Sequence, residues 1–150
     1  MKVTWTSLLA SKKAQRHTTS KNELDDMREL IARDLKDAGV TEISADRRFA
    51  TAYNAALQAA NMAVACAGYR ISSMSGHHKI ALESAQLALG KAANEYADYF
   101  ETCRRKRNMI DYTRPRMATD TEAKEALQRA RDFVELVENW ITKNHPALKK

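Results

Sequence analysis

The chain has 150 residues, which suits a single domain whose hydrophobic core needs neither disulfides nor a structural metal. Only four glycines and two prolines occur and aromatic residues make up 7%, so the composition predicts long helices, an all-α fold and no sheet. The formal net charge of +6 favours an anionic partner, with nucleic acid first, although the same charge would also keep a small protein in solution.

The first stretch, residues 1–19, mixes basic and small polar side chains without a sustained hydrophobic period. We expect a partly ordered arm there, tacked down by Trp5, Leu8 and Leu9. The arm lacks the apolar run of a signal peptide, and no later window approaches the length of a membrane span. We therefore expect a cytoplasmic protein that has no membrane partner.

Helical periodicity fills residues 20–146, which predicts one domain built as a bundle of about five helices. The expected helices cover residues 20–39, 44–68, 77–90, 91 through the basic stretch described next, and 119–145. Capping boxes are expected at Ser20 and Thr119, and either Ser44 or Asp46 can cap the second helix. Cys66 and Cys103 fall inside helical patterns and outside any CxxC pair, which predicts reduced thiols.

A basic stretch at residues 103–116 is the most informative part of the chain. It contains six cations: Arg104, Arg105, Lys106, Arg107, Arg114 and Arg116. The first four are consecutive, and at 100° per residue they cannot share one face of a helix. Asn108 flanks Arg107, and Tyr112 returns to roughly the same face. We interpret the stretch as a phosphate-binding site; the alternative is that its cations complement the helix macrodipole and stay solvated.

Three side chains of this stretch are candidates for catalysis. The fork of Arg107 suits two phosphate oxygens at once, and Asn108 is suited to positioning either the phosphate or an attacking hydroxyl. Tyr112, with an ordinary pKa of ~10, is an acid or an orienting donor rather than a base. The remaining cations, Arg104, Arg105, Lys106, Arg114 and Arg116, are expected to contact the nucleic-acid backbone.

Residues outside the stretch offer auxiliary groups. His77 or His78 can supply a base, although neighbouring helical residues point about 100° apart and a helix-opening or loop-packing role is the favoured alternative. They make a poor metal pair, so we expect no metal and no cofactor. Asp46 suits a helix N-terminus and can alternatively hold an arginine of the site. We assign the tyrosines on apolar faces to the core: Tyr53, Tyr69, Tyr96 and Tyr99.

Three segments resemble the HEPN domain (higher eukaryotes and prokaryotes nucleotide-binding). They are SADRRFATAYNAALQAA, GYRISSMSGHHKIALES and RRKRNMIDY, and together they span most of residues 20–143. The family's R-N-x-x-x-H motif falls on Arg107 and Asn108, and Tyr112 stands where the His is expected, as in the Tyr-bearing branch of the family. The resemblance implies a bundle of four or five helices that forms a homodimer, with two copies of the motif lining one cleft.

The resemblance also implies a function. We expect a protein that acts on RNA, a toxin or defence ribonuclease that needs no metal. The alternative is a non-catalytic HEPN module that binds a nucleotide, an RNA or a partner protein such as an antitoxin. In the family's toxins a Tyr two residues past the motif His is modified by the antitoxin, whereas Arg114 stands there in this chain, so that regulation is not expected. A third possibility is a helical interaction protein with no nucleic-acid role.

Overall fold

The all-α prediction is confirmed. The computed structural model describes residues 3–73, 76–112 and 115–150, with only the backbone described at Asp111 and Tyr112. Within these residues the elements are α1 (Trp5–Ala10), β1 (Ala14–Arg16), α2 (Lys21–Ala38), α3 (Ala45–Cys66), β2 (Tyr69–Ile71), α4 (His77–Leu89), α5 (Asn94–Tyr112) and α6 (Asp120–Asn144), with short 3-10 turns at Gly90–Ala93 and Pro146–Leu148. Five of these helices, of 13 to 25 residues, form the expected bundle.

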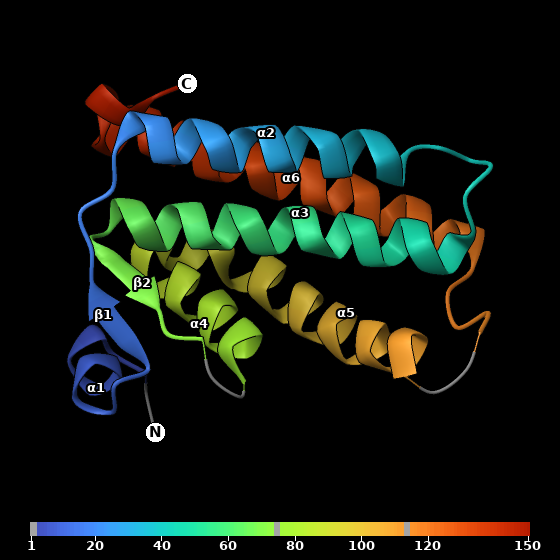
Figure 1. Ribbon diagram of the computed structural model, residues 1–150, viewed down its shortest axis with the longest axis horizontal. Helices are drawn as coiled ribbons and strands as arrows, with labels where there is room; N and C mark the ends of the chain where they lie inside the picture. The colour runs from blue at the N-terminus through green and yellow to red at the C-terminus, as the bar shows by residue number, and fades with distance from the viewer. Residues whose placement is uncertain (1–2, 74–75, 113–114) are drawn as a thin grey trace.

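Helix α3 is the centre of the bundle. Figure 1 shows it between α2 and α6 on one side and α4 and α5 on the other, and it contacts all four. Most of its buried side chains are alanines, which let neighbouring helices approach closely from every direction. The larger core residues Tyr53, Phe100 and Phe133, from α3, α5 and α6, are completely buried or nearly so. They fill the space that the alanines leave open.

Side-chain caps fix where the long helices begin. At α6 the hydroxyl of Thr119 accepts from the backbone N–H of Glu122, whose carboxylate accepts from the N–H of Thr119, so the expected capping box is complete. Helix α3 begins after Ser44, which accepts from the N–H of Arg47, and this decides between its two candidate caps. Asp46 is therefore available for another role.

The capping box expected at α2 forms only in part. The hydroxyl of Ser20 accepts from the N–H of Glu23 at 3.1 Å. The Glu23 carboxylate, however, bonds His17 at 2.8 Å and the Thr19 hydroxyl at 2.7 Å. These two partners tie the chain before α2 to the first turn of that helix.

The N-terminal arm is more regular than its sequence indicates. Residues 14–16 form β1, which pairs antiparallel with β2 so that Ala14 lies opposite Ile71 and Arg16 opposite Tyr69. Trp5 of α1 stacks on Tyr69 with ring centroids 4.0 Å apart, as its proposed anchoring role requires. The expectation of no sheet was wrong in this detail, because strands of three residues are too short to produce a period of alternation.

Both cysteines are buried and free. Burial raises the pKa of each thiol to about 11, so Cys66 and Cys103 stay protonated and behave as small apolar core residues.

In the part of the chain that the structure describes, none of the helices has the length and apolar character needed to cross a bilayer.

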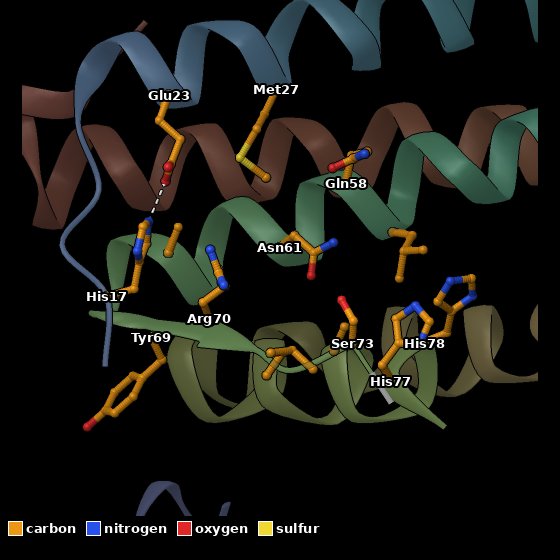
Figure 2. Close-up of a pocket in the computed structure, with 14 residues that line it drawn as sticks. His17, Glu23, Met27, Gln58, Asn61, Tyr69, Arg70, Ser73, His77 and His78 are labelled. Carbon is orange, nitrogen blue, oxygen red and sulfur yellow. Dashed lines mark hydrogen bonds and ion pairs between the residues drawn. The ribbon is translucent and has the colours of Figure 1, made fainter. Parts of the chain in front are cut away.

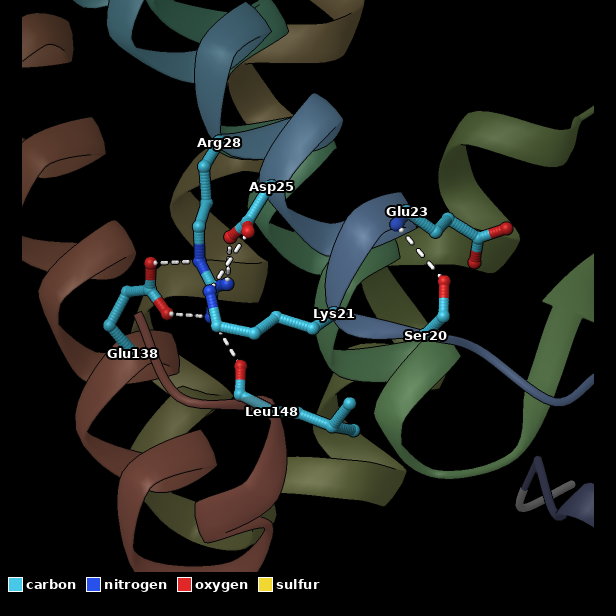
Figure 3. A network of polar contacts seen from close by, with 7 residues as sticks. All are labelled: Ser20, Lys21, Glu23, Asp25, Arg28, Glu138 and Leu148. Carbon is cyan, nitrogen blue, oxygen red and sulfur yellow. Dashed lines mark hydrogen bonds and ion pairs between the residues drawn. The ribbon is translucent and has the colours of Figure 1, made fainter.

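A buried arginine joins α2 to α6 and to the C-terminal turn. Figure 3 shows Arg28, whose side chain is 8% exposed, between Glu138 and Asp25. Its guanidinium donates to both oxygens of Glu138 at 2.8 and 2.9 Å, to Asp25 at 2.7 Å and to the Leu148 carbonyl at 2.8 Å. The hydrogen bonds to the carboxylates raise the pKa of Arg28 above its ordinary value. Four donated bonds at one buried group make this a structural contact rather than a surface ion pair.

We predict that Arg28→Ala lowers the free energy of unfolding by about 2 to 3 kcal/mol, because Glu138 loses a two-pronged partner in a poorly hydrated place. Arg33→Ala is the matched control on the same helix, since its side chain is 62% exposed and should cost less than about 1 kcal/mol. Urea denaturation followed by circular dichroism measures both. Equal losses for the two variants would contradict the structural role of Arg28.

Candidate functional site

The basic helix α5 and the first turn of α4 enclose a small cleft. It has a volume of about 240 Å³, and its walls are Gly76, His77, His78, Arg104, Arg107 and Asn108. Two groups of residues that the sequence analysis considered separately, the basic stretch and the adjacent histidines, therefore meet in one place. The family motif alone does not join them, because 29 positions separate His78 from Arg107.

Arg107 lines this cleft and is half-buried. Its guanidinium carbon is 5.7 Å from the centre of the Tyr53 ring, within the range of a cation–π contact. Tyr53 is completely buried in α3, so it provides a rigid floor that fixes the direction of the arginine. Asn108, the next residue, also lines the cleft and is exposed.

His78 faces the same tyrosine from the opposite wall. The Tyr53 hydroxyl oxygen lies 3.4 Å from Nδ1 of His78. Burial lowers the pKa of His78, and His77, Arg107 and Arg104 lower it further by charge repulsion. The imidazole is therefore neutral near pH 7. Burial also raises the pKa of Tyr53, which keeps its hydroxyl protonated.

Two proton arrangements are compatible with the contact between Tyr53 and His78. In one, the hydroxyl donates to Nδ1 and the proton of the imidazole sits on Nε2. In the other, Nδ1–H donates to the Tyr53 oxygen, which leaves a free lone pair on Nε2. The second arrangement makes Nε2 of His78 a general base, and the first makes it a hydrogen-bond donor. Both use a neutral imidazole, as the lowered pKa of His78 requires.

The first turn of α4 adds a positive dipole to the cleft. The helix begins after Gly76, which adopts a left-handed conformation with φ 81°, and among the described residues no side chain caps it. The positive end of its macrodipole therefore lies at the cleft wall. Such a helix start favours an anion, and here it lies beside Arg107 rather than alone.

The other cations of the basic helix have different surroundings. Arg104 lines the cleft but donates two bonds to Glu101, at 3.0 and 2.8 Å. Arg105 is 73% exposed, with Nε 3.6 Å from the same carboxylate. Lys106 faces away from the cleft: it pairs with Glu122 of α6, and its ammonium lies 5.8 Å from the Phe49 ring centre. The four consecutive cations are thus distributed around the helix, as their spacing predicts.

Arg114 and Arg116, which were also expected to contact the nucleic-acid backbone, follow α5 in the sequence and precede α6. Arg114 lies outside the described residues. Arg116 is exposed and has a left-handed backbone with φ 57°. Asp46 accepts from the backbone N–H groups of Arg116 at 2.7 Å and Ala118 at 2.8 Å. Asp46 therefore anchors this loop through the backbone.

Tyr112 is the last residue of α5, and its side chain lies outside the described part of the structure.

The sequence analysis assigned Tyr53 to the core and gave it no role in the site. It is a core residue, yet it also contacts both Arg107 and His78. No local pattern could have revealed this, because both contacts join segments distant in the chain.

Comparison with known proteins gives one family match. A family model described as HEPN_SAV_6107-like HEPN matches residues 40–138, which include α3, α4, α5 and most of α6. No curated protein and no solved structure matches the chain significantly. The cleft lies entirely within the matched residues. Among the residues that the structure describes, no group of three or more His, Cys, Asp or Glu side chains could hold a metal ion.

We predict that His78 titrates below the ordinary histidine pKa of ~6.5, because burial and three positive neighbours oppose its protonation. The folded state then binds fewer protons than the unfolded state, so this group lowers the free energy of unfolding as the pH falls below ~6.5. Titration of the imidazole carbons by NMR measures the pKa. Arg107→Ala should raise it only in part, since burial is the larger cause, whereas Arg105→Ala should leave it unchanged. A wild-type pKa at or above ~6.5 would contradict the electrostatic description of the cleft.

Proposed function

The chain belongs to the HEPN family, and from this premise we propose that it acts on RNA as a metal-independent endoribonuclease of a toxin or defence system. The observation that carries the proposal is the cleft in which Arg107 and Asn108 lie opposite His78. These residues offer a cation for a phosphate, an amide to orient it and a neutral imidazole beside both. The start of α4 adds the positive end of its macrodipole to the same wall.

Cleavage by such a site requires no group beyond RNA and the chain. The 2′-hydroxyl oxygen attacks the neighbouring phosphorus while its proton passes to Nε2 of His78. Arg107 donates to the phosphate oxygens on which negative charge grows, and Asn108 orients the phosphate or the attacking hydroxyl. The bond from phosphorus to the 5′-oxygen breaks, and that oxygen takes a proton from an acid. The products are a 2′,3′-cyclic phosphate and a 5′-hydroxyl.

Tyr112 is the proposed acid or orienting donor of this reaction, on the basis of its position in the R-N-x-x-x-Y motif. The base comes from α4 in this scheme, whereas the family's motif His would come from α5. His78 takes the role of base in preference to His77 because it is half-buried and contacts Tyr53, which orients the ring.

A non-catalytic HEPN module that binds a nucleotide, an RNA or a partner protein is the second candidate. The observation that favours it is Tyr112 in place of the motif His. Both candidates share the phosphate-binding role of Arg107 and differ in turnover. A homodimer that brings two clefts together, a cytoplasmic location and an antitoxin partner are further parts of the first proposal. The homodimer and the antitoxin follow from the family resemblance, and the location follows from cysteines that fall outside any CxxC pair.

We predict that Arg107→Ala abolishes RNA cleavage, or RNA binding if the protein does not cleave, while the fold remains intact. Purified protein is incubated with total RNA in EDTA, and circular dichroism monitors the fold. Arg129→Ala is the matched control, because Arg129 also lies over a tyrosine ring, 5.1 Å from the centre of Tyr99, but lines no part of the cleft. Unchanged cleavage and RNA affinity in Arg107→Ala would refute the proposed phosphate site.

We predict that His78→Gln and Tyr112→Phe each lower the cleavage rate on the order of tenfold to a thousandfold, since one removes the base and the other the donor. Tyr112→His should hold or raise activity, because an imidazole with a pKa of ~6.5 restores the family's motif. Initial rates on a labelled RNA measure all three variants. Full activity of His78→Gln would show that the base is another group, and full activity of Tyr112→Phe would remove the tyrosine from the reaction.

A further inference from the structure

A second and larger hollow lies next to the phosphate cleft and shares His77 and His78 with it. It has a volume of about 410 Å³ and lies between α2, α3, β2 and α4. Figure 2 shows the ion pair of His17 and Glu23 at one end and the two histidines at the other. Asn61 lies between these ends. The reaction scheme above uses only the histidine end, so the rest of the hollow has no assigned role.

Two amide side chains of α3 face this hollow. Gln58 and Asn61 are three residues apart, so they lie on neighbouring parts of one helix surface, and both line the hollow. Each is half-buried, and within the described residues neither amide group forms a hydrogen bond with the chain. Other amides of this protein do find partners: Gln86 donates to Asn94, and Gln128 donates to Asp132. The two amides of α3 thus retain their full set of donors and acceptors for a ligand.

The remaining lining of the hollow is mixed, with polar side chains from His17, Glu23, Arg70, Ser73 and the two histidines of α4 beside apolar ones. Met27 of α2, Leu57 of α3, Ile71 of β2 and Ala81 of α4 contribute aliphatic surface on different sides. Aliphatic surface beside hydrogen-bonding side chains suits a flat heteroaromatic ring whose edge carries hydrogen-bonding atoms. The ring faces would contact the aliphatic side chains, and the ring edge would meet the amides.

Adenine is the nucleobase whose edge matches an amide best. The amide oxygen accepts from the exocyclic N6 amino group, and the amide nitrogen donates to N7, which is the standard pairing of Asn or Gln with adenine. Guanine is read most often by an arginine that donates to O6 and N7. Arg70 lines the hollow but is exposed. Among the half-buried polar groups, His17 and Glu23 bond each other and His78 contacts Tyr53. The two amides of α3 are therefore the groups best placed to read a base edge.

The geometry of α3 links the hollow to the phosphate cleft. Tyr53, Leu57 and Asn61 follow one another at intervals of four residues on one face of the helix, spanning ~12 Å along its axis. Tyr53 contacts the cleft at one end of this row, and Asn61 lines the hollow at the other. A nucleotide whose phosphate lies at Arg107 can extend past the two histidines toward the amides.

We propose that this hollow binds the adenine base of one nucleotide of the RNA substrate, with Gln58 and Asn61 as the residues that select it. The inference rests on the proposed function, because it assigns sequence preference to the same RNA-cleaving site. It makes Gln58 and Asn61 specificity-determining residues, separate from Arg107, which holds the phosphate. Adenosine alone should therefore occupy the hollow, and ribose 5-phosphate alone should occupy the cleft.

The test uses the intact chain labelled with ¹⁵N and follows the side-chain signals of Gln58, Asn61 and Arg107 by NMR. Adenosine should shift the two amide signals and leave Arg107 in place, and ribose 5-phosphate should do the reverse. Guanosine, cytidine and uridine should shift the amides less than adenosine at equal concentration. Absence of an amide shift with adenosine overturns the proposal, and equal shifts with all four nucleosides overturn the selection of adenine.

Variants separate the base pocket from the phosphate site. Asn61→Ala and Gln58→Ala should each weaken adenosine on the order of tenfold, as expected for loss of one amide pairing. Gln128→Ala, an exposed amide on α6, is the matched control and should bind adenosine normally. Arg107→Ala should no longer bind ribose 5-phosphate and should still bind adenosine. Unaltered adenosine affinity in both amide variants overturns the assignment of Gln58 and Asn61 as the residues that select adenine.

A cleavage assay distinguishes failure of this inference from failure of the proposed function. RNAs that differ only in one base next to a single cleavage site are compared with the wild-type protein, and cleavage beside A is expected to be fastest. Cleavage without base preference, together with no adenosine shift, leaves the ribonuclease proposal intact and overturns the pocket. An adenosine-specific shift without any cleavage supports the pocket and refutes the ribonuclease proposal.

Discussion

The small side chains of α3 are the constraint on which the rest of the structure depends. A helix that contacts neighbours on all sides must carry small residues wherever another helix comes close, and alanines meet this requirement along α3. The close approach of α4 and α5 to this helix brings the start of α4 to the basic half of α5. Tyr53 is the large residue that remains between them, and it contacts Arg107 and His78 together. The cleft is therefore a direct product of the packing around α3.

The charges of the cleft act on each other in a way that suits phosphate chemistry. Arg107 and Arg104 help to keep His78 neutral, and burial contributes more. A phosphate bound at Arg107 would bring negative charge and offset that repulsion, so the imidazole would accept a proton more readily in the complex than in the free protein. Glu101 binds the guanidinium of Arg104. In the proposed reaction, His78 is thus a neutral base before RNA binds and a stronger one once RNA has bound.

The sequence predicted the parts of the fold that local physics controls. Hydrophobic periodicity located the five long helices, and the hydroxyl caps at Ser20 and Thr119 located two of their starts. The pairing of β1 with β2 escaped prediction because it joins two segments of three residues that are 50 or more positions apart. Lys106 illustrates what could not be predicted about the site. Its spacing indicated that the four consecutive cations diverge, but only the position of α6 determines that Lys106 meets Glu122. Contacts between distant segments are not encoded in any short window of sequence.

The proposed motif has Tyr112 where the family's His is expected, and this assignment changes what the site requires of the fold. When a motif supplies cation and base from one helix, their separation is set by the helical turn alone. Here the imidazoles come from the first turn of α4, whose start is set by the left-handed backbone of Gly76. Their distance from Arg107 then depends on how α4 and α5 pack on α3, with Tyr53 as the common contact. A site assembled in this way is sensitive to core packing as well as to its own residues, and Tyr53 is the position where these two requirements coincide.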